Sequence, residues 1–212
     1  MDNLNTSPLP PLTCQPNNFM KLKLISLLLS LTGCSSYGQG VVIDQQSTNL
    51  IEGAAFLQSG QPMGQSFTPT LSSVGFVLLN LYDGDVFNNT GGTVYVNLRS
   101  NSITGAILSS STAVFMPHDF FGITNFFFST PVAVAPGTTY YLQPVAQLGS
   151  DGFGSYVTDG SYARGSEIYQ GGSVVGQNLW FQEGILGVPE PSPIWLAWLG
   201  GAAWLLVRRH CQ

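Results

Sequence analysis

Apolar and polar positions alternate along much of the middle of the chain. Within residues 93–99, Val94, Val96 and Leu98 fall on one face of an extended segment, and more polar side chains fall on the other. A two-residue period of this kind predicts a β-strand with one face in a hydrophobic core. Residues 72–82 instead form an almost unbroken apolar run, which predicts a strand covered on both faces.

Shorter strand-like runs follow, separated by clusters of Gly, Asn, Asp and Pro that favour turns. These further strands are expected at residues 106–109, 112–116, 123–129, 140–146, 154–158 and 178–185. No segment between them keeps a helical period long enough for a β-α-β unit. The pattern predicts an all-β domain over residues 41–187, a β-sandwich of jelly-roll-like form.

Three consecutive phenylalanines, Phe126 to Phe128, must point to alternate sides of their strand. We expect these rings to pack in the core, with Phe120 and Phe121 covering whichever ring faces outward.

The N-terminal region has the layout of a secretory signal peptide. Lys21 and Lys23 precede a short apolar run at residues 24–31, which is too short for a permanent membrane anchor. We therefore assign residues 20–40 to a signal peptide and residues 1–19 to an upstream extension that is not native. Within the same segment, the Leu-Thr-Gly-Cys sequence ending at Cys34 has the form of a lipobox, so lipidation of Cys34 remains an alternative to signal-peptidase cleavage.

The C-terminal region combines a short motif, an apolar segment and a basic end. Residues 188–191 read Val-Pro-Glu-Pro, residues 194–207 carry no charge, and Arg208 and Arg209 follow. An apolar helix that ends in basic residues predicts a transmembrane segment with a cytoplasmic C-terminus. The segment rises only about 21 Å as a helix, so residues from Val188 onward must help it to span, or its insertion is temporary.

This tail, residues 188–212, resembles the PEP-CTERM sorting signal of Gram-negative bacteria. The resemblance is carried by Val188, Pro189, Glu190 and Pro191, by the helix and by the basic stop. It implies an exosortase-like enzyme as a partner, which would recognise the motif and cleave the tail during export to the cell surface or the extracellular space. The membrane would hold the precursor through the helix, at least transiently.

The middle of the chain is similar to jelly-roll domains of bacterial exported proteins. The similarity is diffuse and rests on residues 64–68, 71–82, 94–96, 126–132 and 136–141. It implies a fold more than a ligand, although sandwiches of this kind often resemble carbohydrate-binding modules.

Charge is scarce, at 8% of residues, with a net charge of −5. In residues 41–187 only Arg99 and Arg164 stand against nine acids, a balance of 2 − 9 = −7. So few bases exclude a basic nucleic-acid-binding surface. Cys14, Cys34 and Cys211 all lie outside this domain, so its stability must come without a disulfide.

The domain offers little for catalysis. It has a single histidine, His118, and neither Lys nor Cys, so a nucleophile with its base and orienting group is not expected. Glycoside hydrolysis needs only two carboxylates, for which the candidates are Asp83, Asp85, Asp151, Asp159, Glu167 and Glu183. We do not expect an enzyme, and a glycan-cleaving activity is the remote alternative.

Two further ligand classes stay open. The oxygens of Asp83, Asp85 and Asn88 suit Ca²⁺, although a plain hairpin turn accounts for the same residues; no His or Cys cluster indicates another metal, and no cofactor is expected. A glycine-rich region carries polar aromatic rings that either stack on a sugar or pin a loop. The residues of this second set are Tyr156, Tyr162, Trp180 and Asp159; for Trp180, which stands between Leu179 and Phe181, packing is the favoured role.

The sequence thus predicts a non-catalytic, exported surface or extracellular-matrix protein. The alternative is a carbohydrate-binding module for bacterial exopolysaccharide.

Overall fold

The computed structural model describes residues 40–85, 87 and 89–187. The predicted upstream extension (residues 1–19), the predicted signal peptide (residues 20–40) except its last residue, and the predicted sorting tail (residues 188–212) lie outside the described residues. In the described part there is no helix long and apolar enough to span a membrane.

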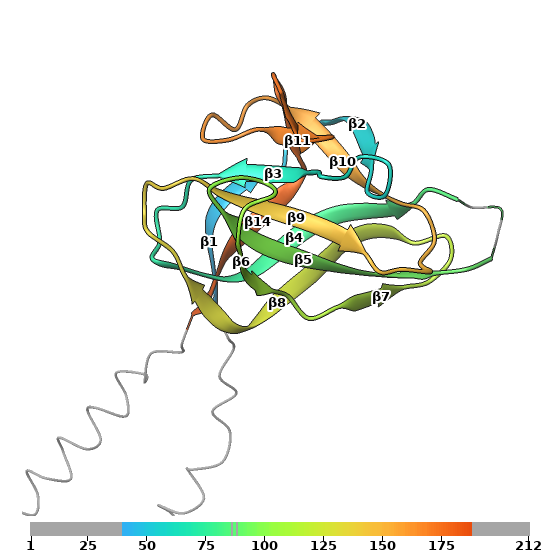
Figure 1. Cartoon of the computed structure of the whole chain (residues 1–212), viewed down its shortest axis with the longest axis horizontal. Helices are drawn as coiled ribbons and strands as arrows, with labels where there is room; N and C mark the ends of the chain where they lie inside the picture. The colour runs from blue at the N-terminus through green and yellow to red at the C-terminus, as the bar shows by residue number, and fades with distance from the viewer. Residues whose placement is uncertain (1–39, 86, 88, 188–212) are drawn as a thin grey trace, which may run out of the picture. The chain divides into compact units, whose positions relative to one another are not determined.

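The described residues form β-strands in two antiparallel sheets that pack as a β-sandwich (Figure 1). The first sheet has the order β1-β14-β4-β10-β13, with β2 paired to β10 and β8 paired to β4. Its strands are β1 (Gly40–Ser47), β2 (Ile51–Phe56), β4 (Ser73–Asp83), β8 (Phe121–Ala133), β10 (Phe153–Asp159), β13 (Gln177–Leu179) and β14 (Phe181–Gly187).

The second sheet has the order β12-β11-β3-β9-β5-β6, with β7 paired to β5. Its strands are β3 (Gly64–Phe67), β5 (Gly92–Ser100), β6 (Ile107–Ser110), β7 (Val114–Met116), β9 (Tyr140–Ala146), β11 (Glu167–Tyr169) and β12 (Gly172–Val174). The predictions of an all-β fold and of a sandwich are both confirmed.

Strand β4 is covered on both faces, as its apolar run predicts. Val77, Leu79 and Leu81 are fully buried in the core, and Phe76, which points to the other face, is only 2% exposed. The strand pairs with β8, β14 and β10. Because its backbone and both faces are occupied, β4 is the centre of the first sheet.

The core between the sheets is built from large rings and branched chains. Phe67, Phe126, Phe153 and Phe181 are all fully buried. On β8 the alternation is as expected, because Phe126 and Phe128 (6% exposed) point inward. Phe127 is 40% exposed, so the expectation that Phe120 and Phe121 cover the outward ring is wrong.

The two ends of the described domain are joined by strand pairing. Strand β1 runs antiparallel to β14, and Gly40 lies opposite Gly187. A bulge between Ile43 and Gln45 displaces Asp44 from the ladder. The Asp44 carboxylate accepts hydrogen bonds from the backbone N–H groups of Thr70 (2.7 Å) and Leu71 (2.9 Å), which fastens β1 to the loop before β4.

The strand predicted at residues 178–185 is interrupted at Trp180. The sequence shows one run, but the structure has β13 ending at Leu179 and β14 beginning at Phe181. The Trp180 N–H donates to the carbonyl of Tyr156 (2.8 Å). Before this residue the segment pairs with β10, as β13, and after it the segment pairs with β4, as β14. This break follows from tertiary pairing, because the residues around it, Leu179, Trp180 and Phe181, carry no turn signal.

The phenylalanine run provides a matched stability test. Phe126→Ala should lower the free energy of unfolding by about 3–5 kcal/mol, because it removes a fully buried ring and leaves a cavity. Phe127→Ala, at the partly exposed neighbouring position, should cost well under half as much. Urea unfolding of both variants measures the difference, and equal losses would contradict the assigned facing of β8.

Candidate functional site

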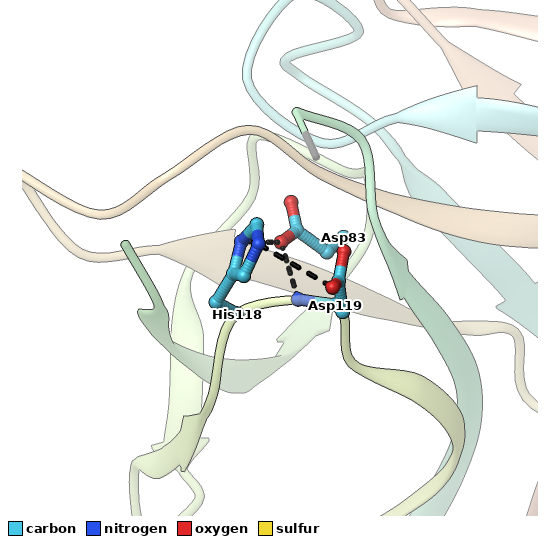
Figure 2. Close-up of side chains that lie close together, drawn as sticks. All are labelled: Asp83, His118 and Asp119. Carbon is cyan, nitrogen blue, oxygen red and sulfur yellow. Dashed lines mark hydrogen bonds and ion pairs between the residues drawn. The ribbon is translucent and has the colours of Figure 1, made fainter. Parts of the chain in front are cut away.

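A cluster of ionisable side chains lies where β4 ends and the loop before β8 passes it (Figure 2). Nδ1 of His118 is 3.4 Å from Oδ2 of Asp83, and Nε2 of His118 is 3.4 Å from Oδ2 of Asp119. The side chain of Asp83 is only 1% exposed, whereas that of Asp119 is 67% exposed. The imidazole therefore bridges a buried and an exposed carboxylate.

The Asp83 carboxylate is already engaged by the backbone. Its Oδ1 accepts from the N–H of Asp85 (3.0 Å), and its Oδ2 accepts from the N–H of Asp119 (2.9 Å). Asp119 has a positive φ of 58°, a conformation that the bond to Asp83 helps to hold. The cluster thus fastens the His118 loop to the end of β4.

The same three side chains offer the ligand atoms that a cation site uses. One ligand atom from each of Asp83, His118 and Asp119 falls within a 4.8 Å span. Sequence reasoning did not find this group, because Asp83 and Asp119 are 36 positions apart and only the fold brings them together. None of the three residues lines the grooves described below, so the arrangement by itself indicates a loop clasp rather than a substrate site.

The residues of the predicted calcium site make separate contacts in the structure. The Asp83 side chain serves the His118 loop, and Oδ1 of Asp85 accepts from the N–H of Phe87 (3.3 Å). Asn88 lies outside the described residues. Aspartates that accept from an N–H two positions on are typical of turns.

Two residues of the predicted sugar-binding set meet in one surface groove of about 800 Å³. Trp180 and Asp159 line this groove together with Asn49, Leu50 and neighbouring residues of the β1–β2 loop. The side-chain amide of Asn49 donates to Oδ1 of Asp159 (3.2 Å) and to the hydroxyl of Ser161. The groove is thereby formed by the β1–β2 loop together with the end of β10 and the break between β13 and β14.

Tyr162 lies at an adjoining groove of about 530 Å³, which also contains Arg164 and Asp44. Its hydroxyl donates to Oε1 of Gln45 (3.2 Å), and its ring packs edge-on against Phe181, with ring centroids 5.3 Å apart. Burial raises the pKa of Tyr162 to about 12. This ring therefore serves mainly as a pin for its loop.

Tyr156 lies apart from Tyr162, on the outer face of the first sheet. Its ring centroid is 4.9 Å from that of Tyr82 and 5.5 Å from that of Phe121. Phe121 is 68% exposed, so these rings form a ladder that reaches the solvent. The structure thus brings Trp180 and Asp159 together, sets Tyr162 beside them, and leaves Tyr156 in a separate cluster.

A buried carboxyl group, Glu183, faces the interior beside the Asp44 bulge. Glu183 is 0% exposed, and neither of its oxygens makes a hydrogen bond of ordinary geometry to a described residue, although the Asp44 carboxylate and the Gln45 backbone lie close to it. Burial, together with the nearby Asp44 carboxylate, raises the pKa of Glu183 to about 9. Burial alone would also raise the pKa of Asp44, but hydrogen bonds from Leu71, Thr70 and Gln45 hold it below its ordinary value.

The remaining candidate carboxylates are separated from one another. Asp151 accepts from the N–H of Gly152 (2.7 Å) and from the hydroxyl of Thr90 (3.3 Å). Glu167 lines a third groove of about 310 Å³, beside β2, and burial raises its pKa. Each of the three grooves thus holds at most one of the six predicted acids. Asp44, whose carboxylate lies close to Glu183, was missed by the sequence analysis because its partners are distant in sequence.

The other predicted sites lie outside the described residues. They are Cys34, the sorting motif at Val188, Pro189, Glu190 and Pro191, and the basic stop at Arg208 and Arg209.

A scan of protein-family models finds no match to the chain, and a search among curated proteins finds no relative of it.

Glu183 gives the fold a defined dependence on pH. Its folded-state pKa of about 9 exceeds the ordinary value of 4.5, so the native state keeps a proton that the unfolded chain releases between these values. The associated stability is present below pH 4.5 and is lost as the pH rises towards 9. The free energy of unfolding of Glu183→Gln should therefore increase relative to that of the wild type as the pH rises, by up to about 1.4 kcal/mol per pH unit.

Urea unfolding at pH 5, 7 and 9 measures this difference. Glu52→Gln, at an exposed position, controls for the loss of one acid. Parallel stability profiles for the wild type and Glu183→Gln would show that Glu183 does not hold its proton.

Proposed function

We propose that this protein is a non-catalytic, exported β-sandwich protein of a Gram-negative bacterium. A signal peptide and a PEP-CTERM-like tail would route it to the cell surface or to an extracellular polysaccharide matrix. The proposal rests on the resemblance of residues 188–212 to that sorting signal. An exosortase-like enzyme is then its processing partner.

The observation that carries this proposal is the pairing of the domain's two ends. Gly40 lies opposite Gly187, and the strands between them complete both sheets. Removal of residues on either side would therefore take away none of the described strands. A protein that must lose a leader and a tail during export needs such an independent fold.

The order of strands supports the finer, jelly-roll-like description. Along the chain, β3 belongs to the second sheet, β4 to the first and β5 to the second, and β8 to β11 again alternate between the sheets. Repeated crossing between two antiparallel sheets is typical of jelly rolls.

The use of its acids supports a non-catalytic role. Asp44, Asp83 and Asp151 accept hydrogen bonds from backbone N–H groups, and Asp159 accepts from Asn49. Carboxylates held in this way stabilise turns and loops. A glycan-cleaving reaction would need two of them across one groove.

Processing of the tail tests the sorting proposal. In a native host that contains the sorting enzyme, the wild-type protein recovered from the culture supernatant should end near residues 188–191, as measured by intact mass. Glu190→Ala should retain residues 194–207 and remain in the membrane fraction, because the motif read by the enzyme is lost.

Glu52→Ala, an exposed acid of the sandwich, is the control and should be processed like the wild type. Unchanged processing of Glu190→Ala would defeat the proposal. A lipid on Cys34 would instead make the protein a membrane-held lipoprotein.

A further inference from the structure

The two grooves beside the β1–β2 loop form one continuous surface feature. The groove of Trp180 and the groove of Arg164 share Thr48 and Asn49 in their linings. Both grooves are shallow and open to solvent, a form that suits an extended ligand lying across the surface better than a small enclosed one.

The Trp180 groove is lined by both apolar and polar side chains. Leu50 and Ile51 are 82% and 45% exposed, and the indole in the same lining is half-buried. Among the polar residues, Asn49 donates to Asp159 Oδ1 and to Ser161, which fixes the amide in place. Asp159 Oδ2 and Asn49 Oδ1 accept no hydrogen bond from another described residue, so both can accept from a ligand. A sugar ring has the matching form, with an apolar C–H face and a rim of hydroxyl groups.

Arg164 supplies a positive charge at the second groove. Its side chain is exposed, and its guanidinium makes no hydrogen bond or ion pair with another described residue. The other arginine of the domain, Arg99, is engaged by Gln143 and by the carbonyl of Gly105. The charge of Asp44, in the same groove, is already met by donors from Thr70, Leu71 and Gln45. The guanidinium fork of Arg164 is thus available to a carboxylate.

The charged side chains also make the two ends of this surface feature chemically different. Asp159 disfavours an anionic group at the Trp180 end, whereas Arg164 favours one at the other end. We propose that the two grooves together bind an acidic glycan, with one sugar ring against Trp180 and the carboxylate of a neighbouring sugar on Arg164. This binding is independent of tail processing, so either proposal can fail while the other holds.

Trp180 also supplies the signal for the experiment. The chain has four tryptophans, and the other three are Trp195, Trp198 and Trp204 in the tail. Replacing those three by Phe in the full-length chain leaves Trp180 as the single tryptophan, whose emission can be excited selectively over that of the tyrosines. Titration with an oligouronate should change its emission saturably, and a neutral β-glucan oligosaccharide of equal length should bind about tenfold or more weakly.

Variants at both ends of the feature test the assigned contacts by isothermal titration calorimetry. Trp180→Ala should weaken oligouronate binding about tenfold or more, because the stacking surface is lost. Arg164→Gln should weaken oligouronate binding similarly and leave neutral glucan binding unchanged. Phe115→Ala, a 67% exposed ring on β7, is the matched control and should bind like the wild type.

The exposed position of Arg164 keeps the test decisive if Trp180→Ala fails to fold. Failure of both glycans to bind would overturn the proposal, as would undiminished binding by Arg164→Gln. Equal affinity for neutral glucan and oligouronate would overturn the assignment of an acidic ligand.

Discussion

Burial of β4 on both faces is the constraint on which the rest of the structure depends. Val77, Leu79 and Leu81 fill the space between the sheets, and the backbone of the same strand pairs with β8, β14 and β10. The domain has no disulfide, so apolar burial and strand pairing must hold it together. The end of β4 also fixes Asp83, and through Asp83 the position of the His118 loop.

Carboxylates act within this fold mainly as acceptors for loops. Asp44 fastens the first strand to the loop before β4, and Asp83 fastens the loop before β8 to the end of β4. Glu183 differs because it is buried without such donors, and a carboxyl group in that position is more stable with its proton. Because most of these acids hold loops in place, few of them lie together in one groove.

The surface features with ligand chemistry lie on loops around one region of the rigid sandwich. Asn49 and Leu50 follow β1, Ser161 and Arg164 follow β10, and Trp180 occupies the break between β13 and β14. A break in a strand turns a side chain that would have joined the sheet towards a groove. The aromatic ladder of Tyr156, Tyr82 and Phe121 is a separate feature of the sheet's outer face.

The sequence alone determined the class of fold and several strands, because a two-residue period is a local property of the chain. Strand β9 was predicted with its observed bounds, and the burial of β4 followed from its apolar run. It did not reveal β1, β2, β3, β11 or β12, whose strands are short, exposed or both. It also put Trp180, Asp159 and Tyr156 in one candidate set, of which the structure brings Trp180 and Asp159 to one groove and leaves Tyr156 apart.

Only the tertiary structure decided which distant residues meet. The bond from Thr70 to Asp44 spans 26 positions, that from Asp119 to Asp83 spans 36, and that from Asn49 to Asp159 spans 110. Local periodicity specifies which way a side chain points from its own strand, but not which strand lies opposite. The pairing of strands across two sheets fixes those neighbours, and with them the clasp, the buried carboxyl group and the groove.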